Sequence, residues 1–99
     1  MEKRVYSWQL PLCVARALVL RFRAHLRERG FEEVLNYMSP AGPDTYELKG
    51  PEGKVFITVT SLGPDRDEVK VEADFPVDGL LRDSVKGLIR ELEEIAQKI

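Results

Sequence analysis

Residues 45–75 read TYELKGPEGKVFITVTSLGPDRDEVKVEADF and decide the fold. The stretch contains three runs in which apolar and polar residues alternate, at 45–49, 55–62 and 68–75. Successive side chains of a strand point to opposite faces, so each run predicts a strand with one buried face. Both turns between the runs begin with Gly-Pro and are short enough to form hairpins. We therefore expect three consecutive antiparallel strands.

The segments on either side of this region predict one further strand and two helices. Residues 5–10 alternate as a strand does, and a proline then opens a helix over 12–29 that a glycine closes. A second helix is expected over 79–98, whereas residues 31–38 fit either a short strand or a helical turn. The order β-α-β-β-β-α predicts one α+β domain over 1–99, with both helices packed on one face of a four-stranded antiparallel sheet.

The composition is that of a soluble globular protein with many charges. Of the 99 residues, 43% are hydrophobic and 32% are charged, and no apolar run approaches the ~20 residues of a membrane span. The single cysteine excludes an internal disulfide, and no secretion signal is recognisable. We therefore expect a cytoplasmic protein without membrane contact. The scarcity of Asn, Gln and Cys beside many ionic residues predicts a thermophile source.

The sequence offers no catalytic nucleophile beside a base. Cys13 and His25 are the only cysteine and histidine, and both belong to the helix expected over 12–29. They are separated along this helix by roughly 18 Å, because a helix rises about 1.5 Å per residue. They cannot form a catalytic pair within one chain. We expect Cys13 to be a small packing residue and His25 to lie at the surface or rim.

Acidic residues do not form a recognisable metal site either. One turn carries Asp65, Asp67 and Glu68, which could hold a hard cation weakly but lack the ligand spacing of a calcium loop. Asp74 and Asp78 flank a strand-to-helix corner, where an aspartate is a plausible helix cap. There is no glycine loop of the kind that binds phosphate. We therefore expect no enzymatic activity, no cofactor and no metal.

The helix expected over 79–98 has one apolar face. Its large apolar residues recur at alternating intervals of four and three: Leu81, Val85, Leu88, Leu92, Ile95 and Ile99. At about 100° per residue these side chains form a stripe, which Ile89 and Ala96 broaden. We expect this face to pack on the sheet. The alternative is a seam with a helix of a partner.

The helix expected over 12–29 has two apolar faces. The main face, which we expect to cover the sheet, consists of Leu12, Ala15, Val19, Phe22 and Leu26, with Leu18 at its edge. A second stripe, centred roughly 140° away, consists of Cys13, Ala17, Leu20 and Ala24. Small side chains let another helix approach closely, so this stripe is the predicted partner-binding surface. The alternative is an ordinary exposed surface on which Ala and Cys are tolerated.

Basic residues form a third feature of the same helix. Arg16, Arg23 and Arg27 lie in a narrow row beside the main apolar face. Lys and Arg exceed Asp and Glu by five within residues 1–30, although the whole chain carries a net charge of −2. This arginine row could meet the phosphates of RNA. The competing interpretation is a solvated charged face, since the pattern does not suggest stacking of bases on aromatic side chains.

Residues 74–90, DFPVDGLLRDSVKGLIR, resemble the end of the small dimeric subunit of the KEOPS complex. In that family the final helix begins with Leu-Arg-x-Ser/Thr and an aliphatic residue, and residues 81–85 fit this pattern. The family also has a strand that leads through proline into an alanine-rich helix, as this chain does. The chain departs from the family at 86–87, where Lys-Gly replaces the usual Asn-Ser, and in the longer segment 31–54. It therefore looks like a divergent relative.

The resemblance implies a non-catalytic subunit. Members of the family dimerise through their sheets and present helices to the catalytic subunit that threonylcarbamoylates adenosine in tRNA. For this chain the resemblance implies a homo- or heterodimer within a larger tRNA-modifying complex, with indirect contact to tRNA. The alternative, from another class, is a stand-alone module that encloses a small ligand, for which the polar candidates at core positions are Tyr6, Trp8 and Tyr46.

Overall fold

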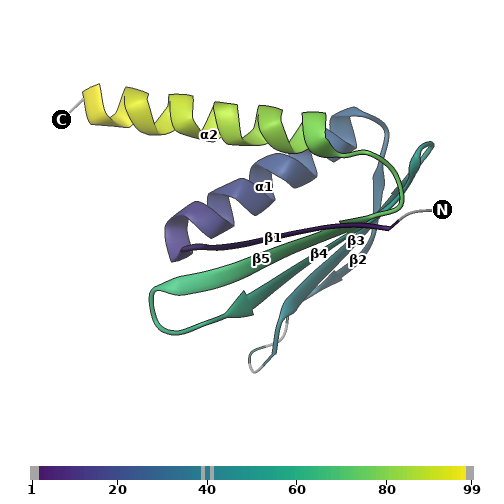
Figure 1. The fold of residues 1–99 in the computed structure, drawn as a ribbon, viewed down its shortest axis with the longest axis horizontal. Helices are drawn as coiled ribbons and strands as arrows, with labels where there is room; N and C mark the ends of the chain where they lie inside the picture. The colour runs from purple at the N-terminus through teal and green to yellow at the C-terminus, as the bar shows by residue number, and fades with distance from the viewer. Residues whose placement is uncertain (1–2, 39, 41, 98–99) are drawn as a thin grey trace.

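Seven elements form one sheet and one layer of helices in the computed structural model, which describes residues 3–38, 40 and 42–97. They are β1 (Arg4–Pro11), α1 (Leu12–Glu28), β2 (Glu32–Tyr37), β3 (Asp44–Gly50), β4 (Gly53–Ser61), β5 (Arg66–Ala73) and α2 (Asp78–Gln97). The strands form a single antiparallel sheet in the order β1-β5-β4-β3-β2. Both helices lie on the same face of the sheet (Figure 1). The predicted α+β class is confirmed, with five strands instead of the expected four.

The additional strand is β2, which occupies the segment that fits either a strand or a helical turn in the sequence. It pairs antiparallel with β3 at the edge of the sheet. The register of this pairing shifts between Glu33 and Leu35, where the strand has a bulge. Val34 and Leu35 are both exposed, at 48% and 45%. A bulge interrupts the two-residue period, so β2 lacks the alternating pattern by which strands are recognised.

The hairpin between β3 and β4 requires glycine at both ends of its turn. A Cβ atom on Gly50 would overlap the ring of Phe31. Gly53 has a φ of 149°, which residues with side chains rarely adopt. A Cβ atom there would also collide with the carboxylate of Asp74, whose Oδ1 accepts a hydrogen bond from the backbone N–H of Lys54 at 2.9 Å. The turn sequence is therefore fixed by close contacts as well as by backbone conformation.

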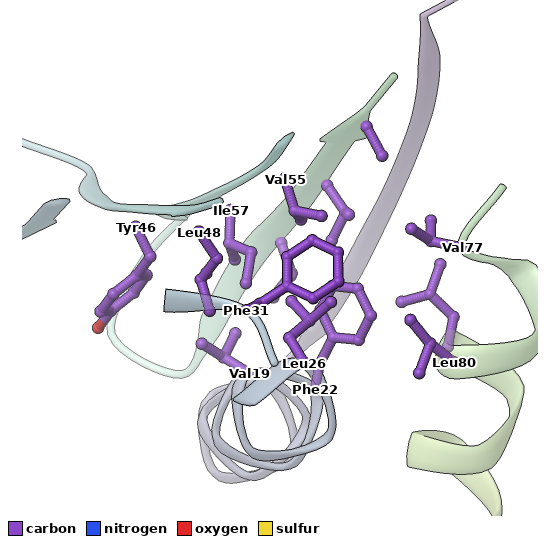
Figure 2. Packing of buried hydrophobic residues seen from close by; sticks show 14 of the residues in the cluster. Val19, Phe22, Leu26, Phe31, Tyr46, Leu48, Val55, Ile57, Val77 and Leu80 are labelled. Atoms are coloured by element: carbon purple, nitrogen blue, oxygen red, sulfur yellow. The ribbon is translucent and has the colours of Figure 1, made fainter. Parts of the chain in front are cut away.

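The core lies between α1 and the centre of the sheet. The five α1 residues buried against the sheet are those that the sequence assigns to its main face: Ala15, Leu18, Val19, Phe22 and Leu26. Leu12, the sixth, is half-buried. Figure 2 shows Val77 and Leu80 entering the cluster from the side of α2, whereas Tyr46 lies on the opposite side of α1. Burial of a large apolar side chain contributes about 1.5–3 kcal/mol, so this cluster fixes the position of α1 on the sheet.

The first half of α2 packs against the rest of the chain and the second half does not. The buried residues of α2 are Leu80, Leu81, Ser84 and Leu88. Four of its apolar residues are 38–52% exposed: Val85, Ile89, Leu92 and Ile95. In Figure 1 the last turns of α2 extend beyond the start of α1 and away from the sheet. The expectation that the whole apolar face of this helix covers the sheet is therefore wrong, and Ile99 lies outside the described residues.

Polar contacts join α1 to α2 where the two helices pack. The Nδ1 atom of His25 lies 2.8 Å from the Oγ atom of Ser84, whose hydroxyl donates to a backbone carbonyl of the preceding turn. Because a hydroxyl has one hydrogen to donate, the His25 ring donates its Nδ1 hydrogen to Ser84. The Arg21 guanidinium pairs with Glu91 and passes over Gly87, where a Cβ atom would be 2.8 Å away from it. His25 is thus a half-buried link between helices.

Candidate functional site

The most prominent surface feature is an apolar stripe on α2. We define the α2 stripe as Val85, Ile89, Leu92 and Ala96. These residues follow one another at intervals of four, three and four, so they lie within about 60° of one another around the helix. Val85, Ile89 and Leu92 are 38%, 50% and 49% exposed. Isolated exposed apolar residues are ordinary, but a continuous row of them indicates an interaction surface.

Charged residues flank the α2 stripe in two blocks of opposite sign. Arg82 and Lys86 lie beside the first half of the stripe, and Glu93 lies beside the second half. All three are exposed. Within the described residues, none of them forms an ion pair. The flank is therefore positive toward the start of α2 and negative toward its end.

The second stripe predicted on α1 lies on the side of the helix that faces away from the sheet. Cys13 and Leu20 are exposed, and Ala17 and Ala24 are half-buried. The expectation that Cys13 is a packing residue is wrong, because its side chain is at the surface. The stripe includes one large apolar side chain, Leu20, which is 60% exposed. Its role as a partner-binding surface stays a prediction.

The arginine row is partly neutralised by β2. The guanidinium of Arg23 lies 2.6 Å from Oε1 of Glu33 and stacks over the ring of Tyr46 at 4.1 Å from its centroid. Arg27 approaches the other oxygen of Glu33 at 3.7 Å. Arg16 is exposed and has no ion-pair partner among the described residues. The row therefore offers less free positive charge to phosphates than the sequence indicates, and contact with RNA stays a prediction.

Tyr6 and Trp8, two of the three polar candidates for a ligand pocket, form part of the junction between β1 and α2. Their rings stack with centroids 6.2 Å apart. The Tyr6 hydroxyl donates a hydrogen bond to a carboxylate oxygen of Asp78 at the start of α2. This hydrogen bond, with burial and the nearby negative charge, raises the pKa of Tyr6 above its ordinary value. The two residues thus hold α2 over the edge of the sheet.

The acidic turn does not bring its carboxylates together. Asp67 is 6% exposed and points to the face that carries the helices, whereas Glu68 points to the opposite face. Asp74 and Asp78 are both occupied as hydrogen-bond acceptors, the former for a backbone N–H of β4 and the latter for Tyr6. In the part of the chain that the structure describes, no three His, Cys, Asp or Glu side chains are grouped so that they could hold a metal ion.

No protein-family model, curated protein or solved structure matches the chain. None of the helices within the described residues is long and apolar enough to cross a membrane. The fold and surfaces define a small α+β domain whose second helix carries an exposed apolar stripe, beside which the charges change sign along the helix. The similarity of residues 74–90 to the KEOPS subunit stays an interpretation of the sequence.

Proposed function

We propose that the protein is a non-catalytic interaction subunit that pairs with a second copy of itself through α2. The observation that carries this proposal is the exposure of Val85, Ile89 and Leu92 on the α2 stripe. Fully burying one such side chain contributes about 1.5–3 kcal/mol relative to leaving it in water. In a symmetric pair each residue of the stripe is buried once in each of the two copies, so the free energy gained from apolar burial is doubled. This gain lets a short seam offset the entropic cost of association.

The charges beside the α2 stripe favour an antiparallel pair of identical helices. If the two-fold axis passes near Ile89, Lys86 of each copy lies opposite the turn that carries Glu93 of the other copy. Arg82 lies one turn further along the helix. In a parallel two-fold pair this flank of the two copies would lie on opposite sides of the seam, so Lys86 and Glu93 would not meet. The flank is thus complementary to itself in the antiparallel arrangement alone, which is the requirement for a two-fold symmetric dimer.

Reversal of the flanking charges tests this arrangement. Lys86→Glu and Glu93→Lys should each weaken the dimer about tenfold, because each replaces two attractive contacts by two repulsive ones at a partly exposed seam. The double variant should restore the dissociation constant of the wild type. Sedimentation equilibrium measures all four proteins, and Arg90→Glu, on the solvent side of α2, serves as the control. A wild type that stays monomeric, or a double variant weaker than either single variant, would contradict the dimer.

The setting that we propose for this dimer is a tRNA-modifying assembly similar to the KEOPS complex, although pairing through α2 differs from the pairing through sheets that the resemblance implies. Support comes from the resemblance of residues 74–90 and from the exposure of Leu20 on the second stripe of α1, which the α2 pairing leaves free. Mixed with a KEOPS catalytic subunit and tRNA, the protein should comigrate with that subunit in size-exclusion chromatography, and Leu20→Glu should abolish this. Failure of the wild type to comigrate would reject the tRNA setting and leave the dimer intact.

A further inference from the structure

A groove of about 780 Å³ runs beside α1, on the side of that helix that faces away from α2 (Figure 2). Its floor is the helix-bearing face of the sheet at Tyr46 and Val59, and α1 forms its wall. Leu12 and Arg23 mark the two ends of this wall, which lie about 17 Å apart because a helix rises about 1.5 Å per residue. The groove is therefore as long as about three turns of a helix.

The two sides of the groove carry the two most exposed large apolar side chains among the described residues. Met38, directly after β2, is 68% exposed, and Leu20 of α1 is 60% exposed. Both line the groove, with Val19 and Val59 deeper inside it. A single exposed apolar residue is ordinary, but two that stand over the same apolar groove indicate that another apolar surface covers them.

Charged residues of both signs accompany this apolar lining. Arg16 is exposed on the α1 wall, and Asp44 is half-buried at the start of β3. Asp44 lies two residues before the buried Tyr46, so it belongs to the helix-bearing face of the sheet. Within the described residues neither of the two forms an ion pair, whereas Arg23 is held by Glu33. A partner with a carboxylate beside Arg16 and a cation beside Asp44 would complement the groove.

The position of the groove indicates the shape of its partner. α2 packs against one side of α1, and the groove occupies the corresponding place on the other side, above the same sheet. Helices of one layer pack side by side with their axes about 8–10 Å apart. We infer that the groove binds an amphipathic helix of a partner protein, whose apolar face covers Leu20 and Met38 and whose acidic flank lies along Arg16. The inference rests neither on the α2 dimer nor on the tRNA setting.

A designed peptide tests the inference. The probe is a fluorescein-labelled peptide of about 14 residues, with leucines at helical spacing, glutamates along one flank of the leucines and lysines along the other. It should bind saturably with a dissociation constant below about 1 mM and shift amide NMR signals of α1 and β3. The Cα signals of an isotope-labelled peptide should move downfield on binding, as they do when a helix forms. Weaker binding, shifts confined to α2, or upfield Cα signals, which report a strand added to β2, would each overturn the proposal.

Neutral substitutions at the two sides of the groove test where the peptide binds. Leu20→Gln and Met38→Gln should each weaken binding about fivefold, because each removes apolar surface that the peptide covers. Val5→Gln, at a 53% exposed residue on the other edge strand, should leave binding unchanged. All three side chains are exposed, so urea unfolding should stay close to that of the wild type. Unchanged binding in the two groove variants, or equal weakening in all three, would overturn the assignment.

A reversal of charge tests the role of Arg16. A second peptide, with lysines on both flanks, should bind the wild type about fivefold more weakly than the first, because its lysines meet the guanidinium. Arg16→Glu should reverse this preference, whereas Arg90→Glu, which changes the net charge equally on the solvent side of α2, should preserve it. The same preference in Arg16→Glu as in the wild type would overturn the proposed acidic flank.

Discussion

Replacing Ile89 by glutamate is expected to dissociate the dimer that we propose. Ile89 lies at the centre of the α2 stripe, where the antiparallel arrangement brings it close to Ile89 of the second copy. The substitution removes two apolar side chains from the seam and places two carboxylates beside each other in a region that excludes water. Because Ile89 is already half-buried in the protomer, the loss of apolar burial from the two copies is about 1.5–3 kcal/mol, which corresponds to an increase of at least about tenfold in the dissociation constant.

The same substitution should leave the folded protomer almost unchanged. Ile89 is 50% exposed and glutamate is a good helix former, so the free energy of unfolding of the monomer should change by less than about 0.5 kcal/mol. Sedimentation equilibrium and urea unfolding measure the two quantities separately. Leu20→Glu makes the same change on the second stripe of α1 and should leave the dimer intact. Dissociation by Leu20→Glu but not by Ile89→Glu would place the dimer seam on α1.

Local patterns were sufficient to predict most of the sheet. The strands β3, β4 and β5 are joined by short turns, so their order and direction follow from chain connectivity and alternation alone. Phe75, which ends the alternating run at 68–75, is 7% exposed. The main face of α1 was predictable for the same reason, since its period of 3.6 residues selects one side of the helix. The strand β2 was not predictable from alternation, because its bulge exposes both Val34 and Leu35.

An amphipathic pattern predicts that one face of a helix will be covered, but it does not identify the element that covers it. The apolar residues of α2 form one regular stripe in the sequence, yet Leu81 and Leu88 are buried in the chain while Val85 and Leu92 are exposed. The difference arises from tertiary geometry, because the side of α2 that carries Leu81 and Leu88 packs against the chain and Val85 lies on the neighbouring side. Leu92 lies on the last turns of α2, which extend beyond the start of α1 (Figure 1). The sequence left a seam with a partner helix as the alternative, and the exposed half of the stripe favours it.

The burial of Asp67 was missed although one signal for it is present in the sequence. Asp67 lies an even number of residues before Val69, Val71 and Ala73 in β5. The alternation of side chains along a strand therefore places its carboxylate on the same buried face. The sequence places this residue in an acidic turn because the strand is expected from Glu68, two residues after the observed start of β5 at Arg66. The groove that Asp67 lines also draws residues from α1, β3 and β4, and no local pattern indicates that these elements converge. A displaced strand boundary thus concealed the burial of Asp67.

Replacing Phe22 by alanine is expected to be the most destabilising of these changes to the protomer. Phe22 is 1% exposed and lies in the cluster between α1 and the sheet (Figure 2), so its truncation leaves a cavity and costs about 3–5 kcal/mol. Leu20, two residues earlier on the same helix, is 60% exposed, and Leu20→Ala should cost less than about 0.5 kcal/mol. Urea unfolding followed by circular dichroism measures both, and the milder Phe22→Leu extends the comparison if the alanine variant does not fold. Equal losses from Leu20→Ala and Phe22→Leu would mean that α1 presents its other face to the sheet, and the free stripe of α1 would then be misplaced.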